Sequence, residues 1–578
     1  MNQYVKKLMI VLLLSMVVLP ISGKALESDL YQETYRNQYH YSAKKNWLND
    51  PNGLVYFDGV YHMFYQHNPE GNEWGNMSWG HATSTDLVHW EEQEVAIPQA
   101  ENSPWVDFWF KTDADEKPVH YIGTPTTNWD GGHPNGKKYI FSGSIIVDKE
   151  NVAGFGENAL LAYYTSTYQV AVRDDDTSID PLGNYLGLRE IQEQCLAYST
   201  DGGKTFTKYQ GSTPVLPVTA VPNGQTGNFR DPKVVYDDQH KKWLMPLVAG
   251  QEVTIFSSTN LKDWTYESSI IREHDRGVGV WECPELIPMR VKGTDELKWV
   301  LSLSVQAGAP AGGSGMQYFV GDFDGKLFHP LTNDTLKNPK WLDFGEDLYA
   351  GMTFSNVPDR TIMLGWMSNW AYVGEQKTTP WKGEMTLPRE LTLVKNGEND
   401  YKIIQKPVKE IDQISQGNIQ LGDRKIKAIE TEKTSQITNF QGTQYKVSAN
   451  FSWKDDLTPD NVGFKLRQSE DGSKYISVGY NPKSQEAYIK RSTDGENINR
   501  DQTKVKLEGN PKNIKLTVYI DSSSIEVFVN DGEKTLTQIV YPNPENPSDT
   551  KNLSFFASNG EVQISNAIGS HLKSIWGN

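Results

Sequence analysis

From about residue 40 onward, the chain consists of short runs of alternating apolar and polar residues separated by turn residues, and long amphipathic helical windows are hard to find. Residues 53–69, GLVYFDGVYHMFYQHNP, are one example: two β-branched and aromatic runs flank Asp58-Gly59, a strong hairpin signal. A period of two suits half-buried strands rather than helices. The sequence therefore predicts an all-β protein.

A turn followed by an aromatic residue recurs in the first part of the chain. The three copies are STDLVHW at 84–90, STDGGKTF at 199–206 and SSTNLKDW at 257–264, each after a β-like run. Such recurrence favours radial repetition, as in propeller blades, although S-T-D and S-T-N turns are common in any β protein. The length of 578 residues also favours more than one domain.

The composition changes near Asn396. A polar connector is followed by about seven short strands with Asn-Gly, Asp-Gly and Ser turns, which predict a β-sandwich. We therefore expect a propeller over residues 26–405, a linker over 406–425 and a sandwich over 426–578.

The N-terminus has the three parts of a secretory signal. Lys6 and Lys7 precede an apolar run over residues 8–21, and small residues follow up to Ala25. We expect residues 1–25 to be a signal peptide cleaved after Ala25, which predicts a secreted, extracellular protein that leaves the membrane after cleavage. The apolar run is shorter than the roughly 20 residues of a membrane span, and an uncleaved anchor is the alternative.

Charge and cysteine content exclude several classes of ligand. The net charge is −17 and no Lys/Arg-rich run is present, so nucleic acid is not an expected partner and a neutral substrate fits better. Cys195 and Cys283 are the only cysteines, and we expect both to be buried, unpaired thiols. The acidic stretch at 173–184 lacks the ligand spacing of a calcium loop and is interpreted as solvated loop. We expect no metal and no cofactor, and the sequence leaves the oligomeric state open.

Three acidic residues stand in similar settings at the start of apolar runs. Asp50 lies in WLNDPNGL at 47–54, Asp231 in FRDP and Glu282 in WECP. Equivalent ends of the innermost strands of a propeller gather around its axis, so we expect the three carboxylates to converge. A proline directly after Asp50 and Asp231 restricts their backbones. The alternative for each is an ordinary turn or structural salt bridge.

Two carboxylates in different environments can hydrolyse a glycosidic bond, one ionised and one protonated. Neighbouring amides are expected to keep the pKa of Asp50 low, which suits a nucleophile, and apolar neighbours to raise that of Glu282, which suits a general acid. An ion pair with Arg230 is expected to hold Asp231 charged, so that it accepts hydrogen bonds from sugar hydroxyls.

These three segments, and several others, resemble the signature segments of glycoside hydrolase family 32. The further segments are FSGS at 141–144, DFGEDLYAG at 343–351, GWMSNW at 365–370 and LPRELTL at 387–393. The resemblance implies a five-bladed β-propeller followed by a C-terminal β-sandwich, and a retaining mechanism with a covalent fructosyl intermediate. It assigns Asp50 as nucleophile, Glu282 as acid/base and Asp231 as transition-state stabiliser. The implied fructosyl pocket is lined by Asn49, Gln66, Trp74, Phe141, Ser142, Arg230 and Trp366, although Trp74 and Trp366 could be core residues and Ser142 a turn residue.

The resemblance implies a fructosidase that acts on levan or inulin, and on sucrose as well, and releases fructose. An endo-levanase or a fructosyltransferase of the same family is the alternative, and a non-catalytic fructan-binding protein is a distant one. Two departures from the family pattern are Leu48, where Met is usual, and a longer segment over residues 97–139. That segment carries Trp105, Phe108, Trp109, Phe110 and Trp129. We hypothesise that it walls the pocket mouth on the leaving-group side, although long loops can be merely structural.

Overall fold

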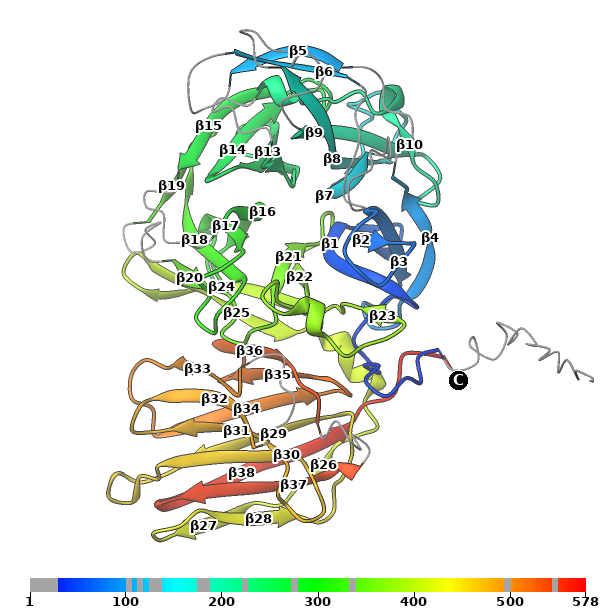
Figure 1. Ribbon diagram of the computed structural model, residues 1–578. Coiled ribbons are helices and arrows are strands. Elements are labelled where there is room, and N and C mark those ends of the chain that lie inside the picture. Colours follow the sequence, from blue (N-terminus) through cyan, green and yellow to red (C-terminus); the bar gives the residue numbers. More distant parts are fainter. Residues whose placement is uncertain are drawn as a thin grey trace, which may run out of the picture.

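The computed structural model describes residues 30–99, 106–111, 118–123, 138–173, 188–220, 227–271, 279–331, 339–492, 500–542 and 549–577. Strands make up nearly all of the regular structure, and the described helices are short 3-10 turns (Figure 1). The predicted all-β class is confirmed. Within the described residues, no helix is long and apolar enough to cross a membrane. The predicted signal peptide lies outside these residues, and so does nearly all of the acidic stretch at 173–184.

The described residues up to 407 form five sheets of mostly antiparallel strands. The first sheet contains β23 (Trp381–Lys382), β1 (Asn46–Phe57), β2 (Val60–Asn68), β3 (Ser78–Ser84) and β4 (Glu91–Ile97). The second contains β10 (Thr207–Lys208), β9 (Leu188–Ser199), β8 (Ala159–Arg173), β7 (Tyr139–Asp148), β6 (Pro118–Gly123) and β5 (Val106–Lys111). The third contains β11 (Phe229–Arg230), β12 (Val235–Asp237), β13 (Lys242–Ala249), β14 (Glu252–Ser258) and β15 (Thr265–Ile271). The fourth contains β16 (Trp281–Arg290), β17 (Leu297–Val305), β18 (Gly315–Phe323), β19 (Phe328–Pro330) and β20 (Lys340–Trp341), and the fifth β21 (Tyr349–Thr353), β22 (Thr361–Trp366), β24 (Arg389–Gly397) and β25 (Asp400–Pro407).

The five sheets lie around a common centre (Figure 1). Consecutive sheets contact one another through β1 and β7, β7 and β11, β13 and β16, and β16 and β21. The circle closes because β21 also contacts β1, and because β23, from late in the chain, pairs in parallel with the start of β1. The strands β1, β7, β11, β16 and β21 therefore lie nearest the centre.

Two larger sheets follow and lie stacked face to face below the ring in Figure 1. One contains β26 (Ile419–Gln420), β27 (Arg424–Ala428), β38 (Gly560–His571), β29 (Tyr445–Ser452), β34 (Asn513–Ile520), β35 (Ser524–Val529) and β36 (Lys534–Ile539). The other contains β28 (Lys433–Ile437), β37 (Asn552–Ser558), β30 (Asn461–Gln468), β31 (Ile476–Asn481), β32 (Glu486–Arg491) and β33 (Gln502–Lys506). A continuous apolar core, which includes Phe451, Phe464 and Phe555, fills the space between them. The 3-10 turns are η1 (Tyr209–Gly211), η2 (Val218–Ala220), η3 (Val373–Glu375), η4 (Lys409–Ile414) and η5 (Asp455–Leu457).

A buried set of charged residues, here called the interface cluster, joins the ring to the two larger sheets. It consists of His40, Asp343, Arg389, Asp521 and Glu526. The ring nitrogens of His40 lie 2.8 Å from Asp521 Oδ2 and 3.0 Å from Glu526 Oε1. Arg389 donates from Nη2 to Glu526 Oε2 at 2.6 Å and from Nη1 to Asp343 Oδ2 at 3.1 Å. These contacts tie the start of the chain and the fifth sheet to β35.

Several of the innermost strands have an interruption in their pairing with the next strand. Register shifts interrupt the pairing of β1 between Leu48 and Pro51, of β7 between Ile140 and Gly143, of β16 between Glu282 and Glu285, and of β21 between Tyr349 and Met352. A bulge places two residues opposite one and changes the direction of a side chain. The candidate residues Asp50, Ser142 and Glu282 lie at these interruptions, which explains why they turn toward the centre rather than into the gaps between sheets.

Candidate active site

The three predicted acids come together at the centre of the ring. Cys283 supplies the geometric link, because its backbone N–H donates to Asp231 Oδ2 at 2.9 Å and its thiol lies 3.5 Å from Asp50 Oδ2. Cys283 is the neighbour of Glu282 in the chain and has a positive φ of 47° at the β16 bulge. One residue thus contacts two of the acids and carries the third beside it.

Asp50 is held by its neighbours on β1 and β7. The Ser142 hydroxyl donates to Asp50 Oδ2 at 2.7 Å, and the Asn49 amide donates to Oδ1 at 3.1 Å. The Asn49 oxygen in turn accepts a 2.7 Å hydrogen bond from the Trp47 indole. The bulges in both strands are what allow these polar side chains to meet.

Glu282 receives hydrogen bonds from three donors on three different elements. Arg230 Nη2 lies 2.9 Å and Gln306 Nε2 3.1 Å from Oε1, and the Tyr349 hydroxyl bonds to Oε2. Its side chain keeps 15% of its surface exposed, whereas Arg230 is buried and is itself held by Asn228 at 2.8 Å. Glu282 is therefore fixed in place yet remains accessible to a ligand.

Asp231 lies directly after β11 with a φ of 64°, a left-handed conformation that is uncommon outside glycine. Its backbone N–H donates to Thr165 Oγ1 at 3.0 Å. Its carboxylate lies 3.8 Å from Arg230 Nε, farther than the 2.9 Å contact between Arg230 and Glu282. The expected ion pair within the R-D-P segment is thus the weaker of the two that Arg230 makes.

The expected low pKa of Asp50 is wrong, and so is the expectation that the ion pair with Arg230 keeps the pKa of Asp231 low enough to hold it charged. Burial, together with the charge of Glu282, raises the pKa of Asp50 to about 6, although hydrogen bonds from Ser142, Asn49 and Cys283 oppose the shift. Burial raises the pKa of Asp231 to about 7: Arg230 opposes this, but the charges of Glu282 and Asp50 add to it. Three carboxylates that share one buried cation cannot all ionise freely. We call Asp50, Asp231, Glu282 and Arg230 the central cluster.

The other predicted pocket residues lie at varied depths around this cluster. Gln66 on β2 is buried, and its amide nitrogen has no hydrogen-bond partner within the described residues. Trp74 and Phe141 are half-buried and pack edge to face, with ring centroids 6.0 Å apart. Trp366 is fully buried against Trp47. This burial fits a core residue, which was the alternative considered for Trp366, and its place in the fructosyl pocket stays a prediction.

Several residues that shape the site were not singled out in the sequence. Tyr349 lies within the quoted segment DFGEDLYAG, but nothing in that string shows that its hydroxyl reaches Glu282. Gln306, Asn228 and Thr165 lie outside every quoted segment and have no local signal. Asn52 was visible inside WLNDPNGL, and both polar atoms of its buried amide lack partners within the described part of the chain. The prediction that Cys195 and Cys283 are buried, unpaired thiols is confirmed.

Comparison with known proteins identifies the same two regions. The model of the glycosyl hydrolases family 32 N-terminal domain matches residues 40–110 and 117–407, and that of the family 32 C terminal matches residues 410–569. A levanase of Bacillus subtilis is 37% identical over 99% of this chain and 75% of its own length. An extracellular exo-inulinase of Aspergillus awamori is 34% identical over 89% of this chain and 91% of its own. The crystal structure of exo-inulinase from the same fungus superimposes with a TM-score of 0.78 at 32% identity, over 94% of this chain and 100% of that one.

Proposed function

The chain belongs to glycosyl hydrolase family 32 and is a glycoside hydrolase, and from that premise we propose that it is a secreted, retaining fructosidase. Its substrates are the β-fructosidic bonds of fructans, levan or inulin, and of sucrose, and its product is fructose. The names of the relatives support this choice, since they include a levanase, an exo-inulinase described as extracellular, and an invertase.

The observation that carries the proposal is the contact of Cys283 with both Asp50 and Asp231. It brings Asp50, Asp231 and Glu282, from three different sheets, within the reach of one sugar ring. Unpartnered buried amides beside them, on Asn52 and Gln66, supply hydrogen-bonding groups that a ligand hydroxyl could satisfy. A carboxylate pair alone could be structural, but a structural pair does not require open amides next to it.

In the first step, the ionised carboxylate of Asp50 attacks the anomeric carbon of the fructosyl unit. The glycosidic C–O bond breaks as Glu282 gives its proton to the departing oxygen, which leaves as an alcohol. The fructosyl unit is now an ester of Asp50, and Glu282 is ionised. Asp231 holds ring hydroxyls and is placed to stabilise the positive charge that develops on the sugar.

In the second step, Glu282 takes a proton from a water molecule, and the resulting hydroxide attacks the same carbon. The ester bond to Asp50 breaks, fructose leaves, and both acids return to their starting states. Double displacement retains the configuration at the anomeric carbon. The carboxyl groups of Asp50 and Glu282 should accordingly lie about 5–5.5 Å apart, since inverting enzymes leave about 6.5–9.5 Å for a water molecule.

We also propose that the five sheets are the blades of a five-bladed β-propeller over residues 26–405. A linker over 406–425 joins it to a β-sandwich over 426–578, and residues 1–25 are a cleaved signal. The arrangement of the sheets around one centre supports the propeller. The core between the two larger sheets supports the sandwich.

The test of the proposed function is digestion of levan, inulin and sucrose, followed by chromatography of the products over time. Free fructose as the sole early product supports exo-acting hydrolysis. A ladder of short oligosaccharides would instead indicate an endo-levanase, and products longer than the substrate would indicate a fructosyltransferase. Binding of fructan with no product would leave only a binding protein.

We propose further that the hairpin β5–β6, a described part of the segment over residues 97–139, stands at the rim of the pocket; Trp105 and Trp129 of that segment lie outside the described residues. The hairpin β5–β6 pairs with β8 near Arg173, beyond the point where β7 begins at Tyr139. The start of β7 carries Ser142, so this end of β8 projects past the site. Shortening the hairpin should change the ratio of rates on long fructans and sucrose. An unchanged ratio, in a variant with an unchanged melting temperature, would show that the segment is merely structural.

A further inference from the structure

A second hollow lies far along the chain from the central cluster, on the outward face of the sheet that contains β30, β31 and β32. Cross-strand pairing aligns four residues in one row: Phe556 on β37, Gly463 on β30, Gly479 on β31 and Tyr488 on β32. Two aromatic residues thus lie at the ends of the row, with two glycines between them. We call this row and the cavity above it the β30–β32 trough.

Only glycine fits at these two positions in the row, because neither has room for a side chain. A Cβ at Gly463 would meet the Val478 carbonyl oxygen at 2.1 Å, and one at Gly479 would meet the Tyr488 hydroxyl at 2.6 Å. Glycine inside a strand marks a place where a ligand or another backbone can approach closely. The cavity is lined by the two aromatic residues of the row, Tyr488 and Phe556, and has a volume of about 230 Å³.

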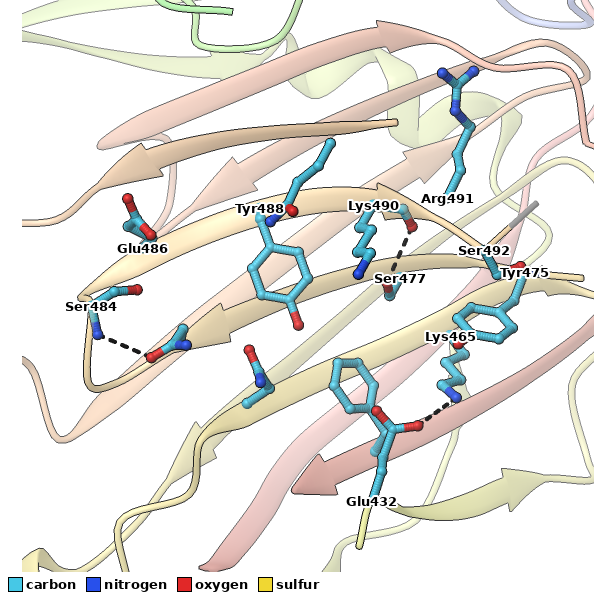
Figure 2. Close-up of a pocket in the computed structure, with 14 residues that line it drawn as sticks. Glu432, Lys465, Tyr475, Ser477, Ser484, Glu486, Tyr488, Lys490, Arg491 and Ser492 are labelled. Atoms are coloured by element: carbon cyan, nitrogen blue, oxygen red, sulfur yellow. Dashed lines mark hydrogen bonds and ion pairs between the residues drawn. The ribbon is translucent and has the colours of Figure 1, made fainter. Parts of the chain in front are cut away.

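Hydrogen-bonding groups face this cavity from the neighbouring row. Figure 2 shows Tyr488, Lys490 and Ser477 on adjacent strands on the same side of the sheet. Neither the Tyr488 hydroxyl nor the Lys490 ammonium has a side-chain or backbone partner in the part of the chain that the structure describes. Tyr475 adds an aromatic ring at one end, beneath the ammonium of Lys465 at 4.0 Å.

Most charges around the cavity are already paired, which argues against a charged ligand. Glu432 pairs with Lys465 at 2.5 Å, and Glu486 with Lys504 at 2.9 Å. The two carboxylates would also repel an anion. What remains is the Lys490 ammonium together with hydroxyl, amide and aromatic groups, a combination that donates hydrogen bonds to the hydroxyls of a neutral sugar and packs against its C–H faces.

We propose that the β30–β32 trough is a second saccharide site, which binds one or two rings of the fructan chain that the catalytic site cuts. The inference rests on the proposed function for the identity of the sugar. The cavity is smaller than the roughly 300–1,000 Å³ of a drug-sized ligand pocket, so it takes a short segment. Binding there holds a long polymer near the enzyme between cleavages, but leaves sucrose, which is too short to engage both sites, unaffected.

The test is affinity electrophoresis of the full chain in native gels that contain levan, inulin or, as a control polysaccharide, dextran. All proteins carry Asp50→Asn so that the gel polymer is not consumed. Tyr488→Ala should reduce retardation by levan or inulin by about threefold to tenfold, the range expected when one sugar contact is lost. Tyr488→Phe, which loses only the hydroxyl, should have a smaller effect. Tyr266→Ala is the matched control, because Tyr266 is an exposed tyrosine on β15, away from the trough.

Sucrose hydrolysis by Tyr488→Ala in the otherwise native chain shows separately whether the variant folds and whether the proposed function holds. Loss of retardation with normal sucrose hydrolysis supports the second site. Equal retardation of Tyr488→Ala and Tyr266→Ala would overturn it, while leaving the catalytic proposal intact. If dextran also retards the protein, and Tyr488→Ala abolishes that retardation, the assignment of the trough to fructan would be overturned. A dimer seen in sedimentation and lost in Tyr488→Ala would show that the trough binds a second copy of this chain instead.

Discussion

The central cluster and the interface cluster each contain three carboxylates in the interior of the molecule, yet the pKa values of Asp50 and Asp231 in one and of Glu526 in the other are shifted in opposite directions. In the central cluster Arg230 is the one cation among them, and the pKa values of Asp50 and Asp231 are raised. In the interface cluster two cations serve three acids. Burial there opposes ionisation of Glu526, but the charge of Arg389 and the hydrogen bond from His40 outweigh it and lower the pKa.

The difference shows that the number of neighbouring cations and hydrogen-bond donors, rather than burial alone, determines the direction of the pKa shift of a buried acid and therefore the role it can have. Burial also works to lower the pKa of His40, but hydrogen bonds to Asp521 and Glu526 raise it to about 9. Both of its ring nitrogens lie on carboxylates, as expected of a protonated imidazole. The interface cluster thus has two cations for its three acids, one cation more than the central cluster has, and it holds two parts of the molecule together. The central cluster keeps uncompensated charge, which is available for chemistry and costs stability.

The largest expected effect is the loss of turnover when either proposed catalytic acid of the central cluster becomes an amide. Asp50→Asn removes the nucleophile and Glu282→Gln the proton donor, and each should lower kcat by several orders of magnitude. Steady-state kinetics on sucrose measure this. Glu282→Gln should be partly rescued on substrates with good leaving groups, which need less protonation. Near-normal kcat in either variant would rule out the role assigned to that residue.

Asp50, Asp231 and Glu282 could be found from the sequence because each marks the start of an apolar run and has proline one or two positions later. The raised pKa values of Asp50 and Asp231 could not, since the approach of Glu282 and the burial that raise them arise only when separate sheets close around a centre. Tyr349 and Gln306 were missed for the same reason, as their contacts with Glu282 come from other parts of the chain. Asp343 and Arg389 of the interface cluster lie in quoted segments, but nothing in those strings shows that both contact β35 or its neighbours, and His40, Asp521 and Glu526 had no sequence signal.

The second effect, on stability, should come from the interface cluster. Arg389→Met leaves the carboxylates of Asp343 and Glu526 buried without their main cation, and removing one partner of a buried ion pair costs about 3–5 kcal/mol. Chemical denaturation monitored by tryptophan fluorescence measures the change. Arg389→Lys is the matched control, because it keeps the positive charge but loses the forked geometry of the guanidinium. Its stability should lie between that of the parent and that of Arg389→Met. If Arg389→Met were as stable as the parent, the cluster would not hold the two regions together.

A smaller effect of opposite sign is expected for Asp231→Asn, which should stabilise the fold. The pKa of Asp231 is about 7 in the folded chain and 3.8 as its ordinary value, so the folded state holds the proton more tightly. Stability therefore falls as the pH rises from about 4 to about 7, and the charged carboxylate is a cost above that range, about 2–4 kcal/mol by linkage. Asp231→Asn should raise the melting temperature at pH 8 and change it little at pH 4. A lower melting temperature of Asp231→Asn than of the parent at pH 8 would contradict the predicted stabilisation.

The smallest expected effect is a shift in the acid limb of kcat/KM, which tests the hydrogen bonds that oppose the raised pKa of Asp50. Activity should fall as the pH drops below about 6, where Asp50 gains its proton. Ser142→Ala removes the 2.7 Å donor and should move this limb to higher pH by about one unit. Cys283→Ala removes only a thiol at 3.5 Å, a weak donor, and should move it by less than half as much. Because both variants delete a donor to the same oxygen, the ratio of their shifts isolates hydrogen-bond strength from burial. A shift in Cys283→Ala equal to that in Ser142→Ala would mean that packing around the central cluster, rather than these donors, sets the charge state of Asp50.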